Sequence, residues 1–285
     1  MMRFLKLIRF NNLLIMVLTQ LSVYQCLNRS FCLNRPISTD FLLLLLTTLF
    51  LGAAGYVIND YFDVKIDAVN KPKALLVDRF IKRRWAIVLH VSLNLTAIAI
   101  GFYLSEYLGL SYIIVASVLW FYSVSLKRKL IIGNLAIALL MAATLLMVKI
   151  YDPSIRLIWV GFFAYFAFFT GWIREIIKDV EDMRGDAMHN CRTLPVVFGI
   201  YKSKLAVMVL NAIMGLSLIA ATVYSFWQEL PLLGWYFILA VLLPFVVFDY
   251  YVRKAHRLRH FSHLSTGLKL IILAGVLAMP VLCLS

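Results

Sequence analysis

Two acidic segments of the sequence share one spacing. The acids are Asp60, Asp63 and Asp67 in the first segment and Asp179, Asp182 and Asp186 in the second, and each segment follows a long apolar stretch. Residues four apart lie on one face of a helix. Asn59 therefore extends the stripe through Asp63 and Asp67, and Lys178 extends the stripe through Asp182 and Asp186. The two segments look like two copies of one binding motif.

Carboxylates at the C-terminal end of a helix repel one another and face the negative end of the helix dipole, so a cation should compensate them. Mg²⁺ suits such a site because it binds one or two carboxylates, waters and substrate phosphates. Two facing stripes would hold metal ions around a diphosphate and assist its departure. The expected metal-binding residues are Asn59, Asp60, Asp63, Asp67, Asp179, Asp182 and Asp186, and the catalytic acids among them are Asp63, Asp67, Asp182 and Asp186.

Basic residues flank both acidic segments and could bind the remaining phosphate oxygens. They are Lys65, Lys71, Lys73, Arg79, Arg174, Lys178 and Arg184. The alternative is that the acids belong to ordinary polar loops and pair with these neighbours. Matching spacing in two loops argues against that reading. A calcium site of EF-hand type lacks its glycine and terminal glutamate.

The elements that position these acids must cross a membrane. The 285 residues are 63% hydrophobic and only 15% charged, with a mean hydropathy of +0.89, which excludes an ordinary water-soluble fold. Nine apolar stretches are long enough to span a bilayer: 11–27, 40–60, 85–105, 108–125, 130–149, 157–177, 203–226, 233–252 and 266–284. No linker divides the chain, so we predict an all-α polytopic membrane protein with one domain over residues 1–285.

The basic residues set the predicted orientation. If the N-terminus is cytoplasmic, 24 of the 28 lysines and arginines fall on the inside, and the outside loops hold only Arg29, Arg35, Lys149 and Arg156. This distribution follows the positive-inside rule. Nine of the fourteen acids lie in two of the inside regions. We expect an integral protein of the cell membrane whose acidic segments face the cytoplasm.

Other chemistries have little support. The net charge of +14 suits an anionic membrane surface, and no nucleic-acid partner or required protein partner is expected. His256, His260 and His263 have metal-ligand spacing, but interleaved arginines and a lysine indicate a basic interfacial loop. Hydrolase, ATPase and dinucleotide motifs are missing from the sequence. Among the four cysteines, only Cys26 and Cys32 could pair across one loop.

The acidic segments resemble those of the UbiA superfamily of intramembrane prenyltransferases, which carry NDxxDxxxD after the second helix and DxxxD after the sixth. Asn59 to Asp67 and Asp182 to Asp186 match these motifs. Residues 174–186 and the following RTLPVVFG are most similar to the digeranylgeranylglyceryl phosphate synthases of that superfamily. The resemblance implies nine helices around a central cavity that opens towards the membrane.

The resemblance also extends to residues outside the acidic segments. Arg9 and Asn12 match the family's N-terminal pattern, and Tyr122, Ser123, Lys127 and Arg128 match the end of its fourth helix. The predicted substrate-binding residues are Asn12, Lys65, Tyr122, Lys127, Arg128, Arg174 and Lys178. Residues 71–84 depart from the Arg-Pro and Pro-Ser-Gly stretch of many relatives, which leaves the acceptor open.

These features predict Mg²⁺-dependent transfer of a polyprenyl group, such as geranylgeranyl, from its diphosphate to a lipophilic acceptor. The resemblance implies geranylgeranylglyceryl phosphate as acceptor, and an aromatic quinone precursor is the alternative. Aromatic residues of the sixth stretch could line a prenyl tunnel: Phe162, Phe163, Tyr165, Phe166, Phe168, Phe169 and Trp172. A secondary transporter is a more remote alternative, because transporters place ionisable groups near the membrane midplane.

Overall fold

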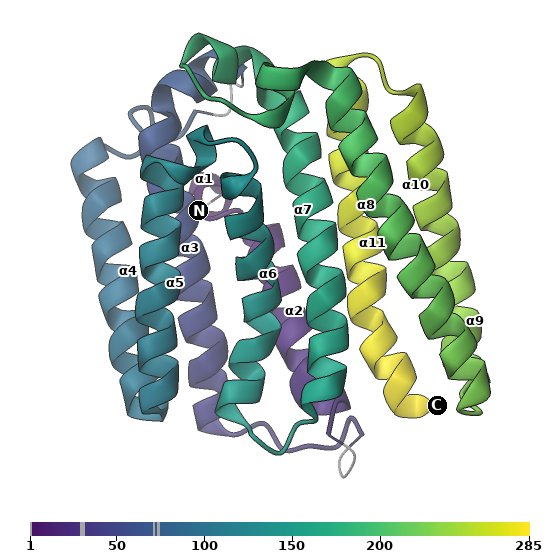
Figure 1. Ribbon diagram of the computed structural model, residues 1–285. Coiled ribbons are helices and arrows are strands. Elements are labelled where there is room, and N and C mark those ends of the chain that lie inside the picture. The colour runs from purple at the N-terminus through teal and green to yellow at the C-terminus, as the bar shows by residue number, and fades with distance from the viewer. Residues whose placement is uncertain (1, 29–31, 71, 73–74) are drawn as a thin grey trace.

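The computed structural model describes residues 2–28, 32–70, 72 and 75–285, and these form a helical bundle (Figure 1). Its helices are α1 (Met2–Leu7), α2 (Phe10–Cys26), α3 (Thr39–Asn70), α4 (Arg83–Leu104), α5 (Glu106–Val124), η1 (Leu126–Arg128), α6 (Ile132–Tyr151), α7 (Leu157–Met188), α8 (Leu194–Trp227), α9 (Pro231–Tyr236), η2 (Phe237–Leu242), α10 (Leu243–Lys254) and α11 (Leu258–Leu284). The segments α9, η2 and α10 run on as one rod, in which η2 is π-helical.

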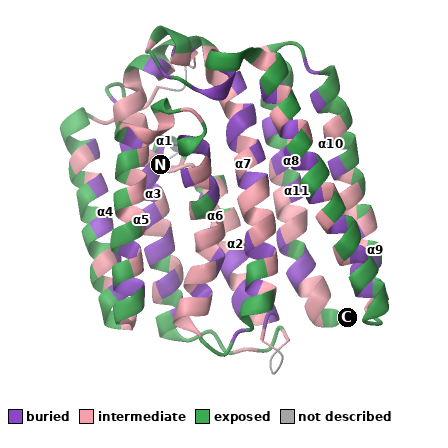
Figure 2. Cartoon of the chain, viewed as in Figure 1, coloured by how far each residue is buried: buried purple, intermediate pink, exposed green. Residues whose placement is uncertain are grey.

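The predicted all-α membrane fold is confirmed. Within the described residues, eight helical segments are long and apolar enough to cross a membrane. The remaining predicted stretch, 11–27, is α2, whose 17 residues fall at the short end of what spans a bilayer. Each of the nine stretches coincides with a helix or with the continuous rod 231–254. Figure 2 shows exposed residues over much of the outer surface, where a bilayer would supply the apolar solvent.

Two helices extend beyond the predicted membrane stretches. Helix α3 continues to Asn70 and α7 to Met188, so both acidic segments lie in the last turns of helices, and the alternative of ordinary polar loops does not hold. The two helices end on the same side of the bundle, at the top of Figure 1. Hydropathy detects where a helix leaves the apolar region, and a charged helix can continue past that point.

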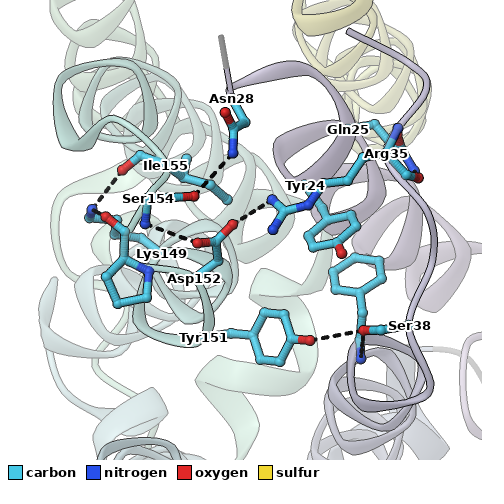
Figure 3. Close-up of polar contacts among 12 residues, drawn as sticks. Tyr24, Gln25, Asn28, Arg35, Ser38, Lys149, Tyr151, Asp152, Ser154 and Ile155 are labelled. Atoms are coloured by element: carbon cyan, nitrogen blue, oxygen red, sulfur yellow. Dashed lines mark hydrogen bonds and ion pairs between the residues drawn. The ribbon is translucent and has the colours of Figure 1, made fainter. Parts of the chain in front are cut away.

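The opposite end of the bundle is held by polar contacts between the α2–α3 and α6–α7 connections (Figure 3). Arg35 forms an ion pair with Asp152, and its guanidinium lies 3.9 Å from the centre of the Tyr24 ring. The hydroxyl groups of Ser38 and Tyr151 are hydrogen-bonded at 3.0 Å. These contacts fix the start of α3 against the end of α6.

A disulfide ties the same end to the C-terminus. It joins Cys32 to Cys283, whose Cα atoms are 5.5 Å apart across 251 residues of sequence. Cys26 and Cys32, which the sequence would allow to pair across one loop, are therefore not joined to each other. Cys26 is a buried free thiol on α2, because its side chain points into the core while residue 32 reaches the end of α11.

Candidate active site

The side chain of Asn70 joins the two acidic helix ends. Its Nδ2 donates to the main-chain oxygen of Asp182 at 2.9 Å, and its Oδ1 accepts the N–H of Gly185 at 2.8 Å. These bonds link the last residue of α3 to the last turns of α7. The two acidic stripes are thereby brought to one place, as their shared spacing predicted. Sequence reasoning gave Asn70 no role.

The first acid, Asp60, is paired with a residue from the entrance to α2. Arg9 Nη2 lies 3.0 Å from Asp60 Oδ1, and the guanidinium lies 4.8 Å from the centre of the Tyr56 ring. Asn12 Nδ2 donates to the Tyr56 hydroxyl at 3.2 Å. Arg9 adopts a left-handed conformation with φ 50°, which turns the chain from α1 into α2 beside α3. Arg9 and Asn12 thus lie beside the first acidic segment.

The second acid, Asp63, forms an ion pair with Lys127 of η1. The two side chains are only 14% and 10% exposed, so this charge pair is largely removed from water. Removing one partner of such a pair leaves an uncompensated charge and is costly. The short 3₁₀ turn η1, between α5 and α6, therefore places a lysine against the acid at the centre of the first stripe.

The acids of α7 differ in their surroundings. Asp179 accepts a hydrogen bond from Asn134 Nδ2 at 2.7 Å, so α6 also contributes to the site. Asp186 Oδ2 accepts a weak bond from the Thr193 hydroxyl at 3.5 Å. One turn before Asp179, buried Glu175 pairs with Arg174 at 3.0 Å. Asn134 and Glu175 were missed as site residues, because apolar helices surround the first and the second lies inside a predicted crossing.

The loop after α7 is fixed by its main chain. The N–H of Arg192 donates to the carbonyl oxygen of Arg128 at 2.9 Å, and the N–H of Cys191 donates to that of Asp186 at 2.9 Å. Burial, together with the nearby charge of Asp186, raises the pKa of the Cys191 thiol to about 11. Cys191 is therefore a neutral packing residue at physiological pH. The same loop places Thr193 beside the last acid of the second stripe.

The donor atoms at this end fit a hard divalent cation bound partly through water and substrate. Asp67 lies within electrostatic reach of Asp182, and Asp186 within reach of Asp63. Among the described residues, no three His, Cys, Asp or Glu side chains converge tightly enough to form a cluster that holds a metal on its own. Mg²⁺ keeps waters and uses few carboxylates plus substrate phosphate oxygens, so single acids from the two stripes could contribute to its binding.

A cavity of about 270 Å³ opens beneath the acids. The polar side chains that line it are Arg9, Asn12, Thr19, Thr48, Tyr56, Asn59, Tyr112, Tyr122, Thr144, Thr170, Arg174, Glu175 and Lys178, and the rest of its lining is apolar or glycine. Lining residues extend along α7 from Lys178 back to Phe162, a rise of about 24 Å at 1.5 Å per residue. The cavity therefore suits a molecule with a charged head and a long apolar chain.

The aromatic residues of α7 divide into two groups. Phe162, Phe163 and Phe166 line the cavity, whereas Tyr165, Phe168, Phe169 and Trp172 lie outside its lining. The Tyr165 hydroxyl instead bonds to Ser217 on α8 at 2.8 Å. Only the stripe of α7 that faces the cavity fits the tunnel prediction.

The remaining basic residues that were predicted to bind phosphate do not all turn their side chains towards the site. Lys65 is exposed and points away from the stripe of Asp63, because residues two apart lie on opposite sides of a helix. Arg128 is also exposed and meets the site through its main chain. Arg79 bonds to the carbonyl oxygen of Pro72. Lys71 and Lys73 lie outside the described residues.

The family follows from a comparison with known proteins. A model of the UbiA prenyltransferase family matches residues 31–267, most of the chain. The chain belongs to the UbiA prenyltransferase family. It is 34% identical over 161 residues to digeranylgeranylglyceryl phosphate synthase of Methanosphaera stadtmanae, an alignment that covers 56% of this chain and 58% of that protein. The chain thus spans less than two thirds of that relative.

Longer matches lie within the same family. The Saccharolobus solfataricus digeranylgeranylglyceryl phosphate synthase is 28% identical over 249 residues, with 82% of this chain and 83% of that protein covered. A solved structure described as digeranylgeranylglyceryl phosphate synthase in membranes has a TM-score of 0.68, with 25% identity and 97% of both chains covered. An Archaeoglobus fulgidus UbiA homologue, described as bound to GPP and Mg²⁺, has a TM-score of 0.67 at 16% identity, with 97% of this chain and 99% of that chain covered.

Proposed function

We propose that this UbiA-family protein transfers a polyprenyl group from its diphosphate to a lipophilic acceptor, with Mg²⁺ as cofactor. The observation that carries the proposal is the Asn70 bridge, which holds two acidic helix ends together above an apolar cavity. The acids alone could bind a cation, and the cavity alone could bind a lipid. Their combination fits a substrate with a diphosphate head and a prenyl tail.

The four stripe acids, Asp63, Asp67, Asp182 and Asp186, would hold the metal ions together with Asn59 and bound water. Mg²⁺ would supply positive charge to the diphosphate and favour its departure as a leaving group. Asp60 and Asp179 complete the predicted metal-binding set. Because Arg9 and Asn134 already bind them, we assign them mainly to the positioning of the donor end of the cavity.

The basic residues at the rim suit the diphosphate. Arg174 and Lys178 line the cavity, as do Asn12 and Tyr122. Lys127 does not line it but forms an ion pair with Asp63 of the first stripe. Such donors, aimed at the diphosphate, stabilise the charge that builds up as the carbon–oxygen bond breaks. Lys65 and Arg128 face outward, so we place them at the protein surface, where they would meet the acceptor headgroup or the membrane.

In the proposed step, the allylic carbon–oxygen bond breaks and the diphosphate leaves with the bonding electron pair. The carbocation that remains lies in an apolar cavity where water is scarce. Phe162, Phe163 and Phe166 line that cavity, and aromatic ring faces attract cations. The acceptor oxygen then forms the new carbon–oxygen bond and releases its proton, which the departing diphosphate can accept.

For the acceptor, we propose geranylgeranylglyceryl phosphate, with geranylgeranyl diphosphate as donor. The names of the Methanosphaera and Saccharolobus relatives support this choice. The exposed basic residues around the rim suit a second phosphate-bearing substrate. Both substrates would enter from the membrane.

We propose that the acidic end faces the cytoplasm. The basic residues gather at that end, as the positive-inside rule requires. The disulfide between Cys32 and Cys283 lies at the opposite end, and disulfides generally persist outside the reducing cytoplasm. Both observations favour the same orientation.

The test is prenyl transfer by purified protein in detergent. Radiolabelled geranylgeranyl diphosphate would be offered with geranylgeranylglyceryl phosphate or 4-hydroxybenzoate, with Mg²⁺ or with excess chelator. We expect product only with the glyceryl lipid and only with Mg²⁺. Transfer to the aromatic acid instead would overturn the acceptor, and absence of transfer to both would overturn the proposed reaction.

A further inference from the structure

A second cavity of about 840 Å³ lies between α10 and α11, away from the acidic helix ends. The two cavities have one lining residue in common, Ile271. The floor of this second cavity, here called the α10–α11 groove, is apolar and buried, with Phe248 and Ile271 only 5% and 6% exposed. Its rim is open: Val247, Tyr251 and Leu270 are 46%, 57% and 67% exposed. The groove thus opens sideways, where the bilayer would lie.

The polar residues of the groove gather at one end and none is acidic. Lys254 is the last residue of α10, and His260 and His263 lie in the first two turns of α11. Lys254 bonds to the Tyr250 hydroxyl, and its Nζ lies 4.4 Å from that ring centre. This end of the groove is therefore a cationic corner at the boundary between the apolar helices and their polar connection.

The geometry of His260 points to a hydrogen-bond donor. The main-chain N–H of His256 donates to His260 Nδ1 at 3.3 Å, so Nδ1 acts as the acceptor. In the neutral imidazole the proton then resides on Nε2, which can donate to a bound ligand. A lysine and an imidazole N–H suit the oxygens of a phosphate group.

Gly267 leaves space in the wall of the groove. A Cβ atom at this position would meet nothing within 4 Å, although glycine in a helix interior weakens the helix. The missing side chain leaves open the part of the groove next to Leu264 and Ile271. A hydrocarbon chain laid along the groove would fill this space.

We propose that the α10–α11 groove binds an anionic phospholipid of the surrounding bilayer. The phosphate lies against Lys254, His260 and His263, and one chain lies along the apolar floor past Gly267. Charge complementarity selects an anionic headgroup, and the lateral opening selects a molecule already in the membrane. Because the bound chain packs on Ile271, it also supports the outer wall of the central cavity. This site is independent of prenyl transfer.

The test is lipid retention by the purified protein, measured by native mass spectrometry and by thermal unfolding in detergent. The probes are dioleoyl phosphatidylglycerol and dioleoyl phosphatidylcholine, which share their chains and differ in headgroup charge. We expect at least tenfold preference for the anionic lipid, together with a rise in unfolding temperature that the zwitterionic lipid does not give.

Three variants locate the site. The triple variant Lys254→Gln, His260→Gln, His263→Gln should lose the preference, and Gly267→Leu should lose retention while the lipid-free protein stays at least as stable as wild type. The matched control, Arg259→Gln, removes a charge from an exposed neighbour that does not line the groove and should change nothing. Equal retention by wild type, the triple variant and Gly267→Leu would overturn the site. Equal retention of both lipids by wild type would overturn the anionic headgroup.

Discussion

The side chain of Asn70 occupies the space that a side chain at position 185 would need. Its Oδ1 accepts the N–H of Gly185 at 2.8 Å, and a Cβ atom on Gly185 would come within 2.5 Å of its Nδ2. This close fit is possible only because residue 185 is glycine. The distance between the two acidic helix ends therefore depends on an asparagine in one helix and a glycine in the other.

The contact between Asn70 and Gly185 predicts that a substitution of either residue lowers the rate of prenyl transfer by a similar factor. Asn70→Ala removes two hydrogen bonds, each worth about 0.5–1.5 kcal/mol, and Gly185→Ala forces Asn70 out of its place. We expect each to lower kcat/KM for prenyl transfer by roughly tenfold or more, since 1.36 kcal/mol is a factor of ten. The measurement is initial rate against Mg²⁺ concentration, in which a wider gap between the acids raises the Mg²⁺ required.

Two controls accompany this prediction. Gly161→Ala lies in the same helix with nothing within 4 Å of the new methyl group and should leave the rate unchanged. The double variant Asn70→Ala, Gly185→Ala should lose less than the sum of the two singles, because both act on one contact. Additive losses would contradict the bridge.

Each acid of the two stripes should be required for Mg²⁺-dependent transfer, so that a single substitution abolishes it. Asp63→Asn and Asp182→Asn keep the size of the side chain and remove its charge, so each should abolish Mg²⁺-dependent transfer while the protein stays folded in detergent. Asp78→Asn is the matched control. Asp78 is exposed on the same side of the bundle and has φ 70°, a conformation that asparagine adopts readily.

Lys127 should be required for efficient use of the donor. Lys127→Met removes the partner of Asp63 and a cation for the diphosphate, and hydrogen bonds to charged groups are worth about 1.5–3 kcal/mol, or roughly 10- to 150-fold in kcat/KM. Steady-state kinetics with varied geranylgeranyl diphosphate would measure the loss. Lys129→Met, an exposed neighbour two residues away, serves as control, and an equal loss in both variants would contradict a specific role for Lys127.

Chain-length selection should depend on Gly275. This residue lines the central cavity, and a Cβ there would meet nothing within 4 Å. Gly275→Leu therefore fills cavity space and should lower kcat/KM for geranylgeranyl diphosphate at least tenfold more than for geranyl diphosphate. Gly215→Leu makes the same change on α8, also in open space but outside the cavity lining, and should leave the ratio of the two donors unchanged.

The ion pair between Arg35 and Asp152 should make stability depend on pH. Although burial opposes it, hydrogen bonds from Ser154 and the Arg35 partner lower the pKa of Asp152 below its ordinary value. The folded state then binds this proton less tightly than the unfolded state. The ion pair therefore stabilises the fold at pH above the ordinary pKa of about 3.9, and this stabilisation is lost as pH falls through the lower pKa of the folded state.

Thermal unfolding of wild type and Asp152→Asn would check this sign. The difference in unfolding temperature between the two proteins should be largest near neutral pH and should shrink at acid pH. Asp40→Asn, an exposed acid at the same end of the bundle, should match wild type throughout. A gap that widens on acidification would contradict the prediction.

The sequence predicted the helical segments of the bundle and the meeting of the two acidic stripes, because hydropathy and spacing are local properties of the chain. It did not predict that α3 runs on to Asn70, since hydropathy reports only where the chain leaves the apolar region. The contacts of Asp60 with Arg9 and of Asp179 with Asn134 join residues 51 and 45 positions apart, which no local pattern specifies.

Some of the missed features left a trace in the sequence. Asn70 stands directly before Lys-Pro, and Gly185 follows Asp182 by three residues. An amide at one helix end and a glycine in the matching segment could have suggested a close approach. The disulfide left no such trace, because Cys32 and Cys283 lie at nearly opposite ends of the chain.

Along α7, the residues at one end are charged and those that line the central cavity at the other end are aromatic. Lys178 and the acids lie towards the C-terminal end of α7, whereas Phe162 and Phe163 lie near its start. Under the proposed function, substitutions at the start of α7 would alter which hydrocarbon fits without disturbing the groups proposed to bind the diphosphate. Natural selection can therefore retune substrate range in this scaffold while the reaction chemistry is inherited unchanged.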